Sequence, residues 1–111
     1  MANTFKNASV SNVANGSYST LYTTPSATTT VVLGLSLANK TTNAVTVQCQ
    51  FTDSSASNAT RQLLENVSIP ANTTLEVFAG QKYILETGDI LKVKAGTGSA
   101  IDAVLGVMQI T

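Results

Sequence analysis

The sequence contains no histidine and no tryptophan, and Cys49 is its single cysteine. One cysteine excludes an internal disulfide framework. A thiol nucleophile needs a base to activate it, and without histidine the usual base is missing. We therefore predict that Cys49 is a small core residue and that the chain is not an enzyme.

Charged residues are scarce, at 11% of the chain against roughly 25% in ordinary soluble domains. The net charge is zero, so the positive footprint of a nucleic-acid binder is missing. No apolar run has the length of a membrane-spanning helix, and the first residues do not read as a signal peptide. We expect synthesis and assembly in a cytoplasm, with no nucleic-acid or membrane partner. A surface with few charges tends to associate, which favours a subunit of a larger assembly.

What the sequence does contain is short apolar runs separated by Thr, Ser, Asn and Gly. Segments 31–37 and 45–51 place large apolar side chains at every second position. A period of two is typical of a strand with one buried face. Segments 29–38 and 44–52 are predicted to pair as an antiparallel hairpin through the five-residue loop 39–43. The side chains predicted to face the core from the first strand are Val31, Leu33, Leu35 and Leu37.

Similar patterns recur along the whole chain. Further strands are predicted at 17–23, 61–69, 74–78, 82–85, 90–95 and 100–110, and residues 1–13 are expected to form an extended arm or an edge strand. The strand 61–69 is expected to contain a bulge or kink near Leu64. About eight or nine strands separated by turns predict a single all-β domain over residues 1–111, an antiparallel β-sandwich. A jelly roll is one version of that architecture, and the sequence does not fix the strand order.

The closing strand 100–110 is apolar on both faces. Such a strand is either central in its sheet or covered by another subunit. We therefore take Val104, Met108 and Ile110, on the face opposite Leu105, as candidate interface residues. Phe5 of the amino-terminal segment is a further candidate.

Two tyrosines of the predicted strand 17–23 complete the candidate interface. Tyr18 and Tyr22 are expected to share one strand face, and tyrosine is favoured at interfaces because it buries a large area at low entropic cost. Packing in the core or between subunits is the plain reading of these rings. Exposed rings would alternatively stack on a sugar or a base.

The acidic residues do not form a catalytic pair or a calcium loop. Glu86 and Asp89 flank a predicted tight turn and are expected to bond its backbone. Asp102 is expected to form an ordinary surface ion pair with Lys92 or Lys94. The sequence therefore predicts no catalytic residue, no cofactor and no metal.

Three stretches of strand and turn stand out: YTTPSATTTVVLGLSLAN at 22–39, SIPANTTLEV at 68–77 and QKYILETGDILKV at 81–93. Together they resemble small virion structural proteins of tailed phages, especially phages of marine bacteria, over roughly residues 20–111. The resemblance implies a non-enzymatic component of the particle whose partners are capsid or tail proteins. It also implies a homo-oligomer, with a trimer favoured, because small β-sandwich decoration proteins of such phages are often trimeric.

Two functions follow as expectations. The first is a capsid decoration or cement protein that is located in the virion and bridges neighbouring shell subunits, with the amino-terminal segment and the closing strand as contact elements. The alternative is a tail- or fibre-associated subunit, or a tip that binds a glycan or another receptor. A binding tip would need an exposed tyrosine cluster or a groove.

Overall fold

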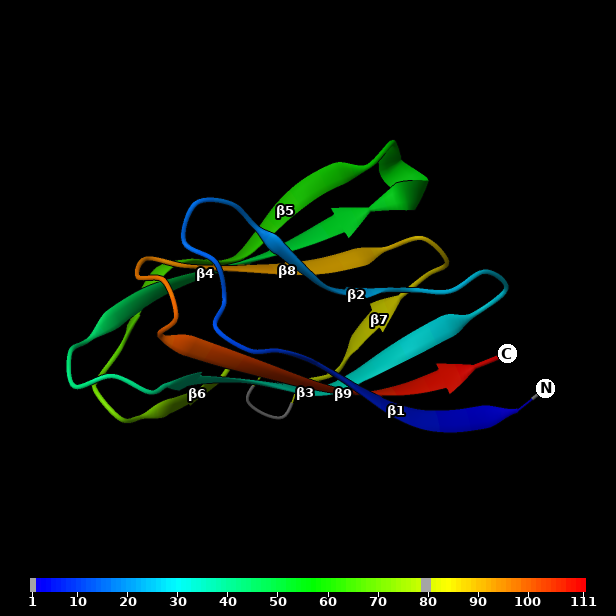
Figure 1. The fold of residues 1–111 in the computed structure, drawn as a ribbon. Helices are drawn as coiled ribbons and strands as arrows, with labels where there is room; N and C mark the ends of the chain where they lie inside the picture. The colour runs from blue at the N-terminus through cyan, green and yellow to red at the C-terminus, as the bar shows by residue number, and fades with distance from the viewer. Residues whose placement is uncertain (1, 79–80) are drawn as a thin grey trace.

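The structure is a computed structural model that describes residues 2–78 and 81–111. Within these residues, nine strands form two antiparallel sheets stacked as a sandwich, which confirms the predicted all-β class (Figure 1). Sheet A consists of β1 (Asn3–Val10), β9 (Ile101–Ile110), β3 (Thr29–Asn39), β6 (Thr74–Glu76) and β7 (Tyr83–Leu85). Sheet B consists of β2 (Ser19–Thr23), β8 (Ile90–Ala95), β4 (Val45–Asp53) and β5 (Ala59–Ile69). A short 3₁₀ turn, η1 (Ser54–Ala56), joins β4 to β5.

The strand order is that of a jelly roll. Strand β1 pairs with β9, β2 with β8, β3 with both β6 and β7, and β4 with β5, all antiparallel. The first four strands are thus paired in reverse order with the last five. The chain corresponds to one long hairpin with its turn at η1, whose paired strands are divided between the two sheets. If β6 and β7 count as one interrupted strand, the result is an eight-stranded jelly roll.

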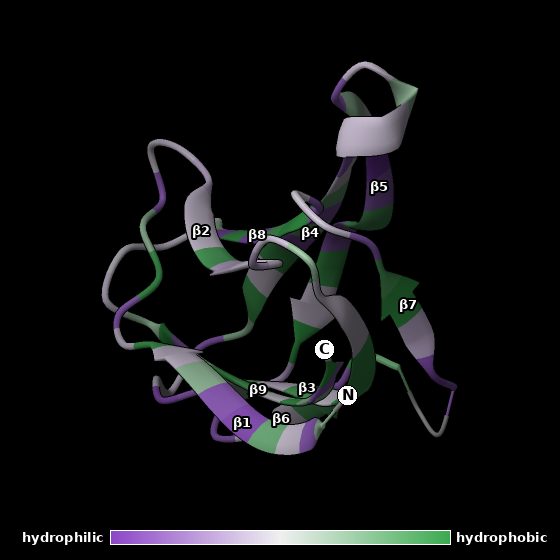
Figure 2. Ribbon diagram, turned by 90° about the vertical axis from the view of Figure 1, so that its right-hand side faces the viewer, coloured by the Kyte–Doolittle hydropathy of each residue, from purple (hydrophilic) through white to green (hydrophobic). Residues whose placement is uncertain are grey.

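The core lies between the two sheets. Alternate residues of the strands face inward, and Figure 2 shows hydrophobic and hydrophilic residues alternating along the ribbons. The largest fully buried side chains come from both layers: Leu35, Leu37, Ile69, Leu85, Leu91, Ile101, Leu105, Val13, Val32, Val47, Val93 and Val107. No helix in the described residues is long and apolar enough to cross a membrane.

The predicted hairpin between segments 29–38 and 44–52 is wrong. Strand β3 lies in sheet A and β4 in sheet B, so loop 39–43 crosses from one layer to the other. The buried side chain of Asn39 makes this crossing possible. Its Nδ2 donates to the carbonyls of Asn43, Ile69 and Pro70, and its Oδ1 accepts from the backbone N–H and hydroxyl of Thr41. The loop therefore has its own hydrogen bonds without a pairing of the flanking strands.

The predicted inward face of β3 is wrong in its first half. The register against β9 shifts between Val32 and Gly34, which marks Leu33 as the extra residue of a β-bulge. Because one inserted residue exchanges the two faces, Val32 is buried while Leu33 is exposed. Beyond the bulge the prediction holds, and Leu35 and Leu37 are fully buried.

The predicted irregularity near Leu64 is confirmed. The register between β4 and β5 shifts on both sides of the pair Cys49–Leu64, and Asn66 has a positive φ of 51°. The strand predicted at 74–78 is shorter, since β6 ends at Glu76. The turn after β7 is as expected, with Gly88 at a φ of 87°.

Candidate assembly interface

Four of the six predicted interface residues lie on one surface, the outer face of sheet A. Residues paired across antiparallel strands point to the same side of the sheet. Phe5 pairs with Met108, Met108 with Val31, and Val31 with Ile84, so these four form one apolar row across β1, β9, β3 and β7. We call this surface face A: Phe5, Val31, Leu33, Ile84, Val104, Met108 and Ile110.

Face A holds every large hydrophobic side chain that is strongly exposed in the described part of the chain. The exposed fractions are 72% for Phe5, 57% for Ile84, 52% for Val104 and 42% for Leu33. Val31, Met108 and Ile110 are half-buried between them. Single exposed apolar residues are ordinary, but a group on one sheet face marks an interaction surface.

Charged groups lie outside the apolar row of face A, although Glu76 is in register with Ser36 and, through it, with Val104 of face A. Glu76 of β6 accepts hydrogen bonds from the backbone N–H of Leu35 and the hydroxyl of Ser36, each at 3.0 Å, and Lys82 precedes β7. Neither belongs to the row from Phe5 to Ile84. Covering that row with a partner therefore desolvates no charge within it.

Strand β1 is the edge strand of sheet A, and all eight of its residues pair with β9. It is not a free arm. Removing the amino-terminal segment would leave β9 without its paired strand β1. The contribution of Phe5 to assembly therefore has to be measured by point substitution. Val31, Leu33 and Ile84 were not predicted as interface residues, because the bulge and the β3–β7 pairing that expose them leave no local signal.

Tyr18 and Tyr22 do not share a face, contrary to the prediction. The register of β2 against β8 shifts between Thr20 and Tyr22, and this bulge turns the second ring inward. The Tyr22 hydroxyl lies 2.8 Å from Thr30 Oγ1 and accepts a hydrogen bond from Gln109 Nε2. Tyr22 therefore joins the two sheets.

Tyr18 lies on the outer face of sheet B. Its hydroxyl donates to Gln48 Oε1 at 3.2 Å and accepts from Gln62 Nε2 at 2.7 Å. The Lys94 ammonium lies 5.6 Å from the ring centroid, within cation–π range. Tyr18 is thus separated from face A by the whole sandwich.

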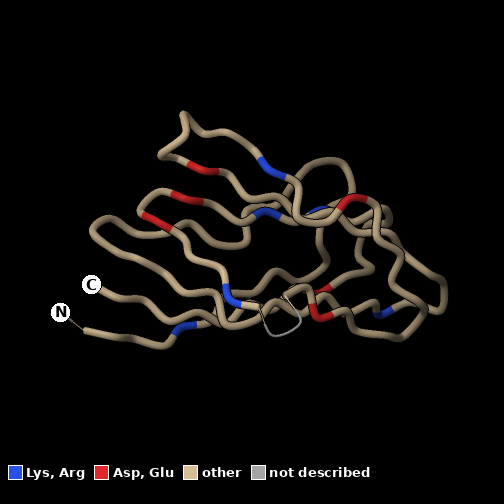
Figure 3. The backbone as a smooth tube through the Cα atoms, turned by 180° about the vertical axis from the view of Figure 1, so that it is seen from behind, with Lys and Arg blue, Asp and Glu red and all other residues tan. Residues whose placement is uncertain are grey.

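The carboxylate oxygens of Asp53, Glu86 and Asp89 lie within 4.8 Å of one another. In Figure 3, acidic positions of the backbone gather at the end of the molecule where the two termini lie. Asp89 is buried and accepts from the backbone N–H and hydroxyl of Ser54 and from the backbone N–H of Glu86. The prediction that Glu86 and Asp89 bond the turn backbone is confirmed for Asp89. These bonds tie the turn to η1, and we assign no metal to the cluster.

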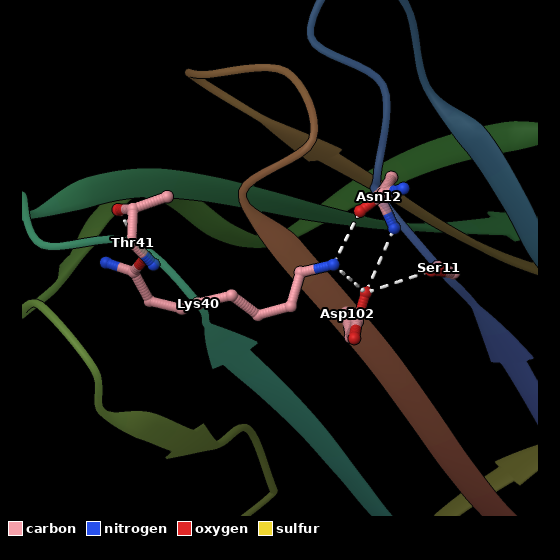
Figure 4. Close-up of polar contacts among 6 residues, drawn as sticks. Ser11, Asn12, Lys40, Thr41 and Asp102 are labelled. Atoms are coloured by element: carbon pink, nitrogen blue, oxygen red, sulfur yellow. Dashed lines mark hydrogen bonds and ion pairs between the residues drawn. The ribbon is translucent and has the colours of Figure 1, made fainter.

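Asp102 pairs with Lys40 at 3.0 Å, not with Lys92 or Lys94 as predicted (Figure 4). The Lys40 ammonium also donates to Asn12 Oδ1, and Asp102 Oδ1 accepts from the Asn12 backbone N–H and the Ser11 hydroxyl. The group fastens the segment after β1 to the ends of β3 and β9. The Asn12 backbone N–H, followed by the Lys40 side chain, holds the pKa of Asp102 below its ordinary value.

Because Asp102 has a lowered pKa in the folded state, its contribution to stability depends on pH. The contribution is complete above the unfolded pKa of aspartate, about 3.9, and is lost as the pH falls through the lower folded value. Both partners are more than a third exposed, so we expect under about 1 kcal/mol at pH 7. Urea unfolding of wild type and Asp102→Asn should show this difference at pH 7 and a smaller one below pH 3.9.

A double-mutant cycle with Lys40→Met isolates the pair. The two substitutions together should cost less than the sum of each alone. Additive costs, or a difference between wild type and Asp102→Asn that is constant with pH, would contradict this assignment.

Cys49 is fully buried on the inner face of β4, as predicted. Burial raises the pKa of its thiol to about 12, because the thiolate would lose its hydration. A thiol in this state is a packing residue, not a nucleophile.

No protein-family profile and no curated protein sequence matches the chain. Among solved structures, the chain is similar to a protein of Bacillus endospore appendages, which form a family of disulfide-linked pili. The TM-score is 0.51 at 10% identity, covering 96% of this chain and 85% of that one.

The chain is also similar to a protein of the T13 particle of IBDV, with a TM-score of 0.55 and 11% identity, covering 96% of this chain and 30% of that one. It therefore spans less than a third of that viral chain. A pentameric capsid protein from metagenomic phage sequences aligns at a TM-score of 0.40 and 20% identity, covering 94% and 60%. The first two likenesses establish a fold shared with a pilus protein and an icosahedral virus protein.

Proposed function

We propose that this chain is a non-enzymatic structural protein of a virus particle, a capsid decoration or cement protein of a tailed phage, and that its copies assemble through face A. The observation that carries the proposal is the gathering of the exposed apolar side chains on that one face. The three stretches that resemble phage virion proteins support the same function. The jelly roll, which is common in viral capsids, agrees with it at the level of fold only.

The outer face of sheet A as a whole, which includes face A, has about the size that a specific interface needs. Ten residues of β9 at about 3.4 Å each and four strands about 4.8 Å apart give roughly 650 Å² in projection. The accessible area of a side-chain surface exceeds its projection, and a standard interface buries about 800 Å² per partner. The occupant we assign is a second copy of this chain, because the apolar row contains no charged side chain that would lose its hydration when a neighbouring copy covers it.

The geometry of that contact decides the oligomer. Face A packed on itself around a twofold axis gives a dimer, whereas face A packed on a different surface of the next copy gives a closed ring when the rotation between copies closes, and a filament when it does not. We propose the ring of three that the resemblance implies. On a shell, such an oligomer would bridge neighbouring capsid subunits and add several kcal/mol of cohesion at each position.

The experiment is sedimentation velocity over a concentration series of wild type and the double variant Phe5→Ser, Ile84→Ser. Both side chains are exposed, so the fold should be retained. Losing two apolar anchors should weaken self-association by about a hundredfold. The matched control is Thr20→Ser with Gln50→Ser, which lie in one row with Lys92 on the outer face of sheet B.

Wild type should sediment as a trimer, and the control should match it. A wild-type chain that stays monomeric at all concentrations would overturn the self-association, as would equal weakening by the control pair. Quantitative mass spectrometry of purified particles tests the location. Hundreds of copies per particle support a shell protein, while a dozen or fewer would move the assignment to the tail- or fibre-associated alternative.

A further inference from the structure

The outer face of sheet B, opposite face A, contains a cavity of about 240 Å³. Its lining comes from four separate parts of the chain: Asn15 of the β1–β2 connection, Thr46 and Gln48 of β4, Asn66 of β5, and Lys94, Ala95 and Gly96 at the end of β8. At about 30 Å³ per water, it holds the volume of about eight waters, which suits one sugar residue. It is smaller than a typical drug site.

The irregularity in β5 builds one wall of this cavity. Asn66 has a positive φ of 51°, which asparagine tolerates better than most residues, and it lies beside the register shift of β5 against β4. The bulge aims the Asn66 side chain at Gln48, whose Nε2 donates to Asn66 Oδ1 at 3.0 Å. Bulges that re-aim a side chain are common beside functional sites.

Small residues form part of the cavity lining. A side chain at Gly96 would place its Cβ within 2.4 Å of Thr46 Oγ1, so glycine is what allows these two lining residues to pack closely. The backbone N–H of Ala95 donates to the Ala14 carbonyl at 3.1 Å, which holds the segment carrying Asn15 over the end of β8. The walls are therefore preformed by backbone contacts.

The cavity presents hydrogen-bonding groups that are not used within the described residues. Lys94 Nζ, Thr46 Oγ1, Asn66 Nδ2 and the Asn15 amide have no hydrogen-bond partner there. Together they offer N–H donors from three segments of the chain, and hydroxyl and amide oxygens as acceptors. Adjacent hydroxyls of a sugar ring both donate and accept, so they match this mixture.

Lys94 gives the cavity a positive charge. It is the one charged residue in the lining, and the ion pair found in the described residues is elsewhere. The nearest carboxylate in the bonding network, Glu65, accepts from Gln48 Nε2 at 3.3 Å and 3.4 Å and does not line the cavity. Tyr18 positions the lysine, because its ring lies under the ammonium.

We infer that this cavity binds an acidic sugar residue of a glycan, with the sugar carboxylate on Lys94 and its hydroxyls on the amides and hydroxyl of Asn15, Thr46 and Asn66. The inference goes beyond the proposed assembly through face A. The two surfaces lie on opposite sides of the sandwich, so the part of the partner that covers face A of a chain does not cover the cavity of that same chain.

The experiment is an NMR titration of the ¹⁵N-labelled wild-type chain with sialyllactose and with a galacturonic acid trisaccharide. Lactose is the matched neutral sugar, and sodium acetate is the matched simple anion. We expect at least one acidic sugar to shift the backbone amides of Thr46, Asn66 and Gly96 in a saturable way. Lactose and acetate should bind at least about tenfold more weakly, since each lacks one half of the contacts.

Two variants locate the site. Lys94→Gln should weaken the binding of the acidic sugar about tenfold, because a hydrogen bond to a charged group is lost. Lys92→Gln is the matched control, two residues earlier on the same strand face and outside the lining, and should leave affinity within about twofold. Asn66→Gly keeps the backbone free to adopt its positive φ and should weaken binding about fivefold.

No shift with either acidic sugar, equal binding of acetate, or an equal loss in Lys92→Gln would each overturn the inference. The titration does not depend on self-association. The Phe5→Ser, Ile84→Ser variant should bind the acidic sugar as wild type does, so the two proposals can fail separately.

Discussion

Replacing Leu105 with alanine is expected to lower the free energy of unfolding by about 2–5 kcal/mol. Leu105 is fully buried in β9, which lies between β1 and β3 at the centre of sheet A. It pairs directly with Leu35, which is also fully buried. The substitution removes apolar contacts from both layers and leaves a cavity that two rigid sheets cannot close.

The size of that loss is large against a typical domain stability of about 5–15 kcal/mol. Urea unfolding followed by circular dichroism should show a lower midpoint with an unchanged slope. The matched control is Val104→Ala, the preceding residue on the same strand, which points outward and is 52% exposed. It should cost under about 1 kcal/mol. Similar costs for both would show that β9 is not a central, two-sided strand.

Strand β9 was predictable because its pattern is unbroken. Ten residues without a bulge keep the period of two, so the sequence correctly separated the face that contains Leu105 from the face that contains Val104. In β3 the same reasoning failed at Leu33. A bulge inserts one residue without changing the composition of the run, so an apolar segment offers no sign of where its faces exchange.

The strand pairing could not be predicted from the sequence pattern, for a different reason. A five-residue loop between two alternating runs usually joins a hairpin, which is why segments 29–38 and 44–52 were paired. In the jelly roll, β3 instead pairs with strands far along the chain. Such contacts depend on which edges remain free after the whole chain has rolled up, and no local residue type encodes that.

The candidate sites also contain a part that the sequence predicted and a part that only the structure shows. Phe5, Val104, Met108 and Ile110 were found from composition and alternation, but their union into face A required the register of β1 on β9. Ile84 joins them only through its pairing with Val31. The cavity on sheet B was not predicted at all, because its lining comes from four distant segments.

Replacing Asn39 with alanine is expected to lower the free energy of unfolding by about 2–4 kcal/mol, because several buried polar groups lose their partner. Asn39 is almost completely buried where the chain crosses from sheet A to sheet B. Its amide group is shared among the carbonyls of Asn43 at 2.8 Å, Ile69 at 3.0 Å and Pro70 at 3.2 Å. Alanine can replace none of these bonds.

The same side chain explains why a crossing is stable where a hairpin was expected. Its oxygen accepts from the backbone N–H and hydroxyl of Thr41 in the loop, and its Nδ2 donates to the carbonyl of Ile69 at the end of β5. One side chain therefore provides hydrogen bonds to polar groups of both segments. Asn43→Ala is the matched control, since the side chain of Asn43 is exposed and only its backbone takes part in these bonds. It should cost under about 0.5 kcal/mol. Equal losses in urea unfolding would mean that the loop sequence in general, and not the buried amide of Asn39, holds the two sheets together at this end.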